Sequence, residues 1–270
     1  MTHLASVVVI LFFACGSPDS GNGGNGGEGV DAGPNDRPRN EQLIRSDPFA
    51  KLVLEVDSVA GFEPRNSVET DLVAGFEPIL DKSGGIDIVR DKAIASRGAD
   101  HAWTFGELDE LAGDTFDLEV GSDAIKVHVL FVDGHHERDD EGQGRILGIA
   151  WSHTNIAMFK QTIEETCAAA TIPPLLRERL CAGAELAIWT HELGHNLGLV
   201  DNGLPMVEDH RDPDPEHGAH DENDECVMFF AFDGSEVVDR IRDRLIVGGD
   251  ETLGFDDECL ADIAAVRDAP

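Results

Sequence analysis

Short apolar or alternating stretches recur along the first 160 residues, and their spacing predicts β-strands. The predicted strands cover residues 51–59, 85–94, 124–134 and 146–159. Longer stretches with apolar residues three and four positions apart predict α-helices. The first predicted helix begins after Pro64 and the second begins after Thr104. The third covers residues 174–199 and the fourth covers residues 255–269. Strands that alternate with helices, followed by an irregular segment and a last helix, predict a fold of the α+β class.

Two of these predicted elements have further features that bear on packing. Leucine and isoleucine residues occur around most of the 174–199 helix, so we expect it to be buried on most sides, and Gly198 is a natural stop for it. Gly and Ala positions in the 146–159 strand allow another group to approach its backbone closely.

The charge balance is strongly acidic. The chain has 270 residues, with 54 acidic against 20 basic side chains and a formal net charge of -34. Such a surface repels nucleic acid and anionic lipid, so nucleic-acid partners are excluded. An apolar fraction of 41% is that of a globular protein with a sizeable core. We expect a monomer.

The N-terminus predicts export. Residues 1–15 contain an apolar run of secretory length that ends at Cys15, and a Gly/Asn-rich stretch follows from 16 to 42. This order resembles a bacterial lipoprotein signal, although Phe12 and the uncharged start depart from the usual pattern. The resemblance implies a lipid on Cys15 and a location at the outer membrane or cell surface. Plain secretion is the alternative. The folded domain then covers 43–270, with subdomains 43–199 and 200–270.

Four cysteines remain after Cys15, and an exported protein favours disulfides. The stretch between Cys167 and Cys181 turns back at two prolines between helical runs, which favours a local bridge. The other bridge would then join Cys226 to Cys259, and other pairings remain open at this point.

The sequence HELGH at residues 191–195 is the main candidate for chemistry. On a helix, His191 and His195 lie one turn apart on one face, so both can bind one zinc ion. Glu192 is rotated beside the ion's open position, where it can act as general base on zinc-bound water. The motif therefore predicts a catalytic zinc site, and it leaves the third protein ligand to be found.

The longer motif H-E-x-x-H-x-x-G-x-x-D resembles the metzincin clan of zinc endopeptidases. In that clan the chain turns back after the glycine to supply the third ligand, which would be Asp201 in this sequence. A methionine turn follows, and ECVMFF with Met228 resembles it. The resemblance implies a twisted mixed sheet over a long active-site helix, with a small irregular C-terminal subdomain and a final helix.

A second alignment competes for the third ligand. HDENDECVM at 220–228 resembles the spacing of archaemetzincins, and it makes His220 the ligand with 201–219 as an inserted loop. Asp201 would then orient a ligand from outside the coordination sphere. His210 and His217 are less favoured alternatives. Archaemetzincins carry further cysteines for a second zinc, but Asp221 replaces one of them, so we expect no second Cys-rich zinc site.

Carboxylates crowd the segment from 208 to 225, and such oxygen density could bind calcium, with a solvated acidic loop as the alternative. The chain contains no tyrosine, so Phe229 follows Met228 where several metzincins have tyrosine near the metal.

These patterns together predict an exported zinc metalloendopeptidase that hydrolyses peptide bonds in a peptide or protein substrate, and that meets a membrane only through its lipid anchor. A non-catalytic, zinc-binding surface lipoprotein is the alternative.

Overall fold

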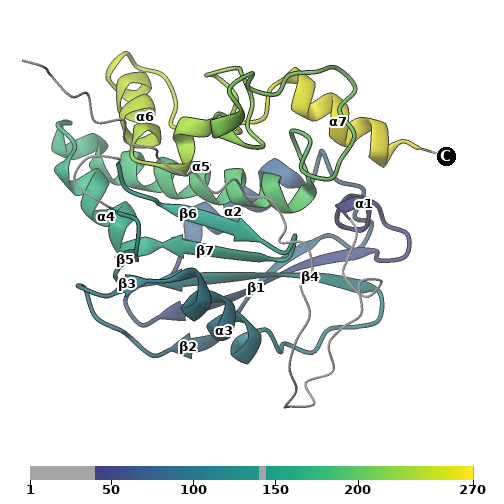
Figure 1. Cartoon of the computed structure of the whole chain (residues 1–270), viewed down its shortest axis with the longest axis horizontal. Coiled ribbons are helices and arrows are strands. Elements are labelled where there is room, and N and C mark those ends of the chain that lie inside the picture. The colour runs from purple at the N-terminus through teal and green to yellow at the C-terminus, as the bar shows by residue number, and fades with distance from the viewer. Residues whose placement is uncertain (1–39, 140–143, 270) are drawn as a thin grey trace, which may run out of the picture.

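A mixed β-sheet forms the centre of the N-terminal part of the molecule (Figure 1). The computed structural model describes residues 40–139 and 144–269. Within these residues the main sheet has five strands in the order β2-β1-β4-β7-β6, and a separate pair joins β3 to β5. The strands are β1 Lys51–Val59, β2 Ile86–Ile94, β3 Ala102–Trp103, β4 Ala124–Val132, β5 His135–His136, β6 Gly148–Trp151 and β7 Asn155–Phe159.

Strands β2, β1, β4 and β7 run parallel, and β6 runs antiparallel to β7 at one edge of the sheet. Successive side chains of a strand point to opposite faces. In β1, Leu54 and Val56 therefore join the larger core cluster, while Val59 joins the smaller cluster on the other face. Burial on both faces explains why these parallel strands are so rich in apolar residues.

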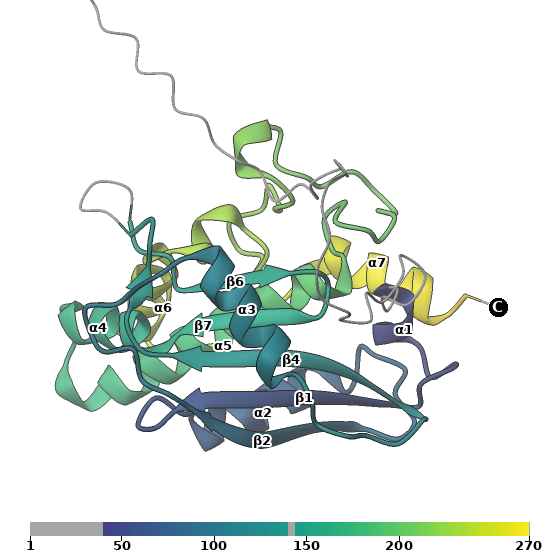
Figure 2. The ribbon, with the colours of Figure 1, turned by 60° about the horizontal axis from the view of Figure 1, so that its bottom comes forward.

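Helices cover both faces of the sheet. In Figure 2, α3 crosses one face, while α2 and α5 lie behind the other. Helix α5 separates the sheet from a C-terminal part that contains α6, α7 and irregular loops (Figure 1). The helices are α1 Asn40–Ile44, α2 Asn66–Phe76, α3 Phe105–Thr115, α4 Lys160–Ala169, α5 Arg177–Leu197, α6 Glu236–Ile246 and α7 Asp257–Arg267. Short 3₁₀ turns occur at η1 Pro174–Leu176, η2 Pro215–His217 and η3 Phe230–Asp233.

Local sequence signals fix several helix ends. Thr104 and Glu107 form a capping box at the start of α3, and Asp256 caps α7 by accepting a hydrogen bond from the Cys259 N–H. Helix α5 ends at Gly198, whose φ of 90° is left-handed and therefore favours glycine. A long helix that ends abruptly lets the chain turn back toward its own face.

The predicted α+β class and the mixed sheet over a long helix are confirmed. The prediction of one strand over 146–159 is wrong, because the stretch is a hairpin of β6 and β7. Ser152 and His153 both adopt positive φ and reverse the chain, without the glycine that usually marks such a turn. The prediction of an irregular segment after 200 overlooks α6, whose Val237, Val238, Ile241 and Leu245 have helical spacing.

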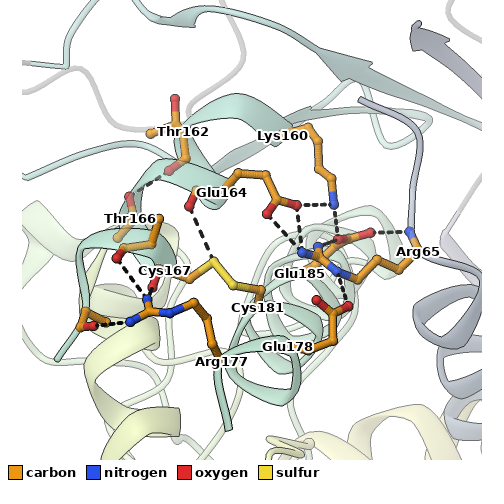
Figure 3. The surroundings of a disulfide bond; sticks show 12 residues. Arg65, Lys160, Thr162, Glu164, Thr166, Cys167, Arg177, Glu178, Cys181 and Glu185 are labelled. Atoms are coloured by element: carbon orange, nitrogen blue, oxygen red, sulfur yellow. Dashed lines mark hydrogen bonds and ion pairs between the residues drawn. A yellow bond between two sulfur atoms is a disulfide. The ribbon is translucent and has the colours of Figure 1, made fainter. Parts of the chain in front are cut away.

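The disulfide Cys167–Cys181 joins α4 to α5 (Figure 3). Beside the disulfide, the carboxylate of the fully buried Glu185 forms ion pairs with Arg65 and Lys160. The backbone N–H of Arg65 also donates to Glu185, at 2.8 Å. This charge is therefore paired and hydrogen-bonded, as burial requires. The disulfide and the ion cluster together fix the N-terminal half of α5 against α4 and the start of α2.

The expected Cys226–Cys259 bridge is wrong for this structure. Both residues are free and buried, with their Sγ atoms 3.8 Å apart. The Cys226 thiol donates to Cys259 Sγ, and the Cys259 thiol donates to Oδ2 of Asp221 at 3.5 Å, so the two sulfurs are hydrogen-bonded rather than covalently joined.

No helix within 40–139 and 144–269 combines the length and apolar character that crossing a bilayer requires. The predicted signal segment, Cys15 and nearly all of the tether lie outside the described residues.

Candidate metal centre

Helix α5 supplies two of the candidate ligands. His191 and His195 lie one turn apart near its C-terminal end, and His191 is fully buried. The helix is surrounded by the sheet on one side and by the C-terminal part on the other, so its direction is fixed by packing (Figure 1). Two imidazoles on such a helix have little freedom to separate.

His220 completes the group from an irregular segment. The Nε2 atoms of His191 and His195 are 3.1 Å apart, and His220 Nε2 lies 3.2 Å from each of them. A tetrahedral zinc ion bound at about 2.0–2.1 Å separates its ligand nitrogens by about 3.3 Å. The three nitrogens therefore fit one zinc ion, and they leave its fourth position for water or substrate.

Backbone carbonyls orient two of these rings. His191 Nδ1 lies 2.7 Å from the carbonyl oxygen of Val227, and His220 Nδ1 is hydrogen-bonded to the carbonyl oxygen of His217. When Nδ1 carries the proton and donates it to a carbonyl, the lone pair of Nε2 is free for a metal. Both contacts therefore favour the tautomer that metal binding needs.

Glu192 directly follows His191 on α5 and is 1% exposed. Its side chain packs against the backbone of Gly148 at the start of β6. A Cβ placed on Gly148 would come within 2.6 Å of Glu192 Oε1 and 2.7 Å of Ile188 Cγ2. The close approach expected of the 146–159 segment is thus the approach of the glutamate, and glycine is required for it.

The Met228 side chain packs against α5 at Gly194. It is fully buried, and a Cβ on Gly194 would come within 2.4 Å of its Sδ atom. Since Gly194 lies between the two helical histidines, Met228 packs directly against the turn that carries them. Its neighbour Val227 supplies the carbonyl that holds His191.

Asp201, the competing third ligand, lies elsewhere. It has a φ of 61° and forms an ion pair of 3.1 Å with Arg211, with its side chain 59% exposed. His217 is paired with Asp212 at 2.8 Å, and its ring stacks on Phe230 with centroids 3.5 Å apart. The structure thus brings His220 to the two helical histidines, and it places Asp201 and His217 outside that group.

The fourth candidate, His210, belongs to a second buried cluster behind His220. Its Nδ1 lies 2.8 Å from Asp221 Oδ2, and its Nε2 lies 3.0 Å from Asp262 Oδ2. Burial lowers the pKa of His210, but hydrogen bonds and charge from the two aspartates outweigh it and raise the pKa above its usual value. The ring is therefore held as a bridge between two carboxylates.

Asn40 is a contributor that the sequence did not reveal. Its Nδ2 lies 2.8 Å from the carbonyl oxygen of Asn196 and 3.1 Å from His153 Nδ1. It thereby ties the end of α5, directly after His195, to the turn between β6 and β7. No motif marks this asparagine, because its partners are more than a hundred residues away.

Calcium receives no support from the acidic loop. Within the described residues, no three carboxylates between 201 and 225 gather closely enough to share one cation. The loop carboxylates instead accept backbone N–H groups or pair with arginine, as Asp212, Asp214 and Asp224 do.

The chain shows similarity to known proteins only at the level of solved structures. No protein-family model and no curated protein matches the chain. Among solved structures, it is similar to an archaemetzincin from Methanopyrus kandleri, with 14% identity and a TM-score of 0.47 over 80% of this chain and 96% of that one. It is also similar to a zinc-dependent peptidase from Methanocorpusculum labreanum, with 11% identity and a TM-score of 0.44 over 78% and 99%. Identities and TM-scores at this level do not assign a function, so the function has to follow from the geometry of the metal centre.

Proposed function

We propose that this protein is a zinc-dependent peptidase that cleaves internal peptide bonds. The observation that carries the proposal is the triangle of three imidazole nitrogens 3.1–3.2 Å apart, with the buried Glu192 directly after His191 on the same helix. Three nitrogen ligands with a fourth position free are typical of catalytic zinc, whereas structural zinc sites are closed by four protein ligands. His191, His195 and His220 are the proposed ligands.

Bound zinc would polarise the peptide carbonyl and make water more acidic. Glu192 is the proposed general base: its carboxylate accepts the proton of the attacking water and then delivers it to the leaving amine. The backbone of Gly148 holds that carboxylate from one side. Met228 and Val227 hold the helix turn and the His191 ring from the other side.

Strand β6 is the proposed platform for the substrate. It is the edge of the described sheet on the side of α5, so one row of its backbone groups has no partner strand in the sheet. An extended peptide can add to such an edge through main-chain hydrogen bonds. Binding of this kind needs no chain terminus, which favours cleavage within a chain over removal of end residues.

The rival function is a zinc-binding surface protein without catalysis. A closed site with both Asp201 and His220 as ligands would favour it. The ion pair of Asp201 with Arg211 and the position of Glu192 both support the peptidase instead.

The first test uses the full chain and its Glu192→Gln variant, with casein as substrate and zinc content measured on both. We expect one zinc per chain in both proteins, cleavage by the wild type that a chelator stops, and a loss of about 10²–10⁴-fold in rate for the variant. Zinc in both proteins with cleavage by neither would favour the binding protein. Equal cleavage by both would remove Glu192 from the mechanism.

Export with a lipid on Cys15 is a separate proposal that rests on the sequence, and the Cys167–Cys181 disulfide supports an oxidising compartment. The mass of the mature N-terminal peptide tests it, with Cys15→Ser as control. A monomer is proposed as well, and light scattering tests it.

A further inference from the structure

The segment that carries His220 has no helix to fix it. Its backbone is held by single contacts: the His220 carbonyl accepts from the Asp212 N–H at 2.8 Å, and the Asp221 N–H donates to the Met228 carbonyl at 2.9 Å. The Glu222 N–H donates to the His210 carbonyl at 3.0 Å. These bonds join the residues around 210, 221 and 228 to one another. Around residue 228 the group is attached to α5, through Met228 against Gly194 and the Val227 carbonyl at His191, but these contacts lie seven or eight residues from His220.

The side chain of His210 links this group to α7, next to the Cys259 thiol of α7, which also donates to Asp221. This ring is only 4% exposed and bonds Asp221 on one side and Asp262 of α7 on the other. Asp221 is the residue directly after His220. Asp262 accepts a second bond at 2.6 Å, from the Val207 N–H, so the same carboxylate also holds the loop before His210. The chain of contacts therefore runs from α7 through Asp262, His210 and Asp221 to His220.

The same cluster could be taken for a second metal site, because His210, Asp221, Asp256 and Cys259 lie close together. Its members are already engaged, however. Both ring nitrogens of His210 face carboxylates, which leaves no lone pair for an ion. Asp256 accepts from the Cys259 N–H and from Asn223 Nδ2, both at 3.0 Å. The His210 ring therefore lies between the Asp221 and Asp262 carboxylates in the place that a bound cation would take.

We propose that His210 is a positioning residue for the metal centre: by bridging Asp221 to Asp262 it holds the segment that presents His220. The inference rests on the proposed zinc centre and adds to it a histidine that does not bind the metal. Contacts that orient a ligand from outside the coordination sphere are typically worth about 10–100-fold in metal affinity. Loss of this bridge should therefore weaken zinc binding while every ligand remains in place.

The test compares zinc affinity, measured by competition with a chromophoric chelator, in the full-length wild type, His210→Gln and Asp262→Asn. Glutamine fills much of the space but cannot donate to two carboxylates on opposite sides. The matched control is His128→Gln, which breaks a similarly buried pair, His128 with Asp57 at 2.9 Å, outside the candidate metal centre. The visible spectrum of the Co²⁺-loaded proteins reports the geometry of the three ligands separately from overall stability.

We expect one zinc per chain in all four proteins. The dissociation constant should rise about tenfold or more in His210→Gln and Asp262→Asn, with an altered Co²⁺ spectrum. His128→Gln should lose thermal stability but keep wild-type affinity and spectrum. Asp262→Asn gives the answer if His210→Gln does not fold.

Three results would overturn the inference. One is wild-type affinity and spectrum in both bridge variants. Another is two zinc ions in the wild type and one in His210→Gln, which would make His210 a ligand. The third is no zinc in the wild type, which would remove the proposed function together with the inference, whereas the first two leave the proposed function standing.

Discussion

His191 and His195 owe their separation to one turn of α5, whereas His220 reaches the same point from a segment without regular structure. The helical pair is set by a repeat of 3.6 residues and by burial along α5. The third histidine depends on hydrogen bonds between residues that are close in space but spread from 207 to 262. One centre thus combines a part that forms with its helix and a part that forms only with the whole fold.

The largest effect should follow removal of a ligand from either part. We expect His195→Ala and His220→Ala each to weaken zinc binding by more than the roughly 10–100-fold of an outer contact. The two variants should differ in the melting temperature of the metal-free protein. His195→Ala only shortens a side chain on a fixed helix, whereas His220→Ala frees a loop. Calorimetric titration with zinc and melting of the chelated variants measure both. Equal affinity in wild type and His220→Ala would restore Asp201 as a candidate.

A smaller loss is expected from Gly148→Ala, which alters the base and spares the ligands. The added Cβ would meet Glu192 Oε1 at 2.6 Å, so the carboxylate must move. A displacement of about 1 Å can cost about 100-fold in rate. We expect kcat to fall by that order with zinc content unchanged. A fall in zinc content of the same size would mean that β6 supports the ligands as well.

Metal removal should separate the two parts directly. With zinc chelated, we expect amide hydrogens of residues 210–228 to exchange about tenfold faster, while those in the middle of α5 keep their protection. Mass spectrometry of the exchanged protein measures this. Equal acceleration in α5 would show that the helix also depends on the metal.

The smallest effect is expected from Asp201→Asn. The substitution removes an exposed ion pair with Arg211, and exposed pairs contribute about 0–1 kcal/mol to the free energy of unfolding. Zinc affinity and kcat should both stay within about twofold of wild type. A tenfold loss of affinity would show that Asp201 acts on the centre after all.

The same division explains how much the sequence could predict. His191, Glu192 and His195 follow from helical spacing alone, and the stop at Gly198 follows from the left-handed backbone that glycine tolerates. His220 could be named only beside Asp201, because both follow a turn whose length the sequence does not determine. The choice depends on how the chain folds back, which is fixed by contacts such as Asp221 with His210.

Other features were out of reach for related reasons. The hairpin turn at Ser152 and His153 lacks the glycine or asparagine that usually signals positive φ. Helix α4 buries the polar Lys160, Gln161 and Thr162 together with Ile163 and Cys167, so its bounds do not follow from an apolar pattern even though the stretch before the two prolines looks helical. The separate thiols of Cys226 and Cys259 could not be distinguished from a bridge, because an even count of cysteines says nothing of the distance between them.

Strand β6 has a consequence for how the protein behaves in concentrated solution. A sheet edge that offers backbone groups to a peptide offers them equally to a second copy of the chain. Two features oppose such association: the strand has only four residues, and each molecule carries a formal charge of -34. Since the reach of that repulsion shrinks from about 10 Å at 0.1 M salt to about 3 Å at 1 M, colloidal stability should be lowest in strong salt.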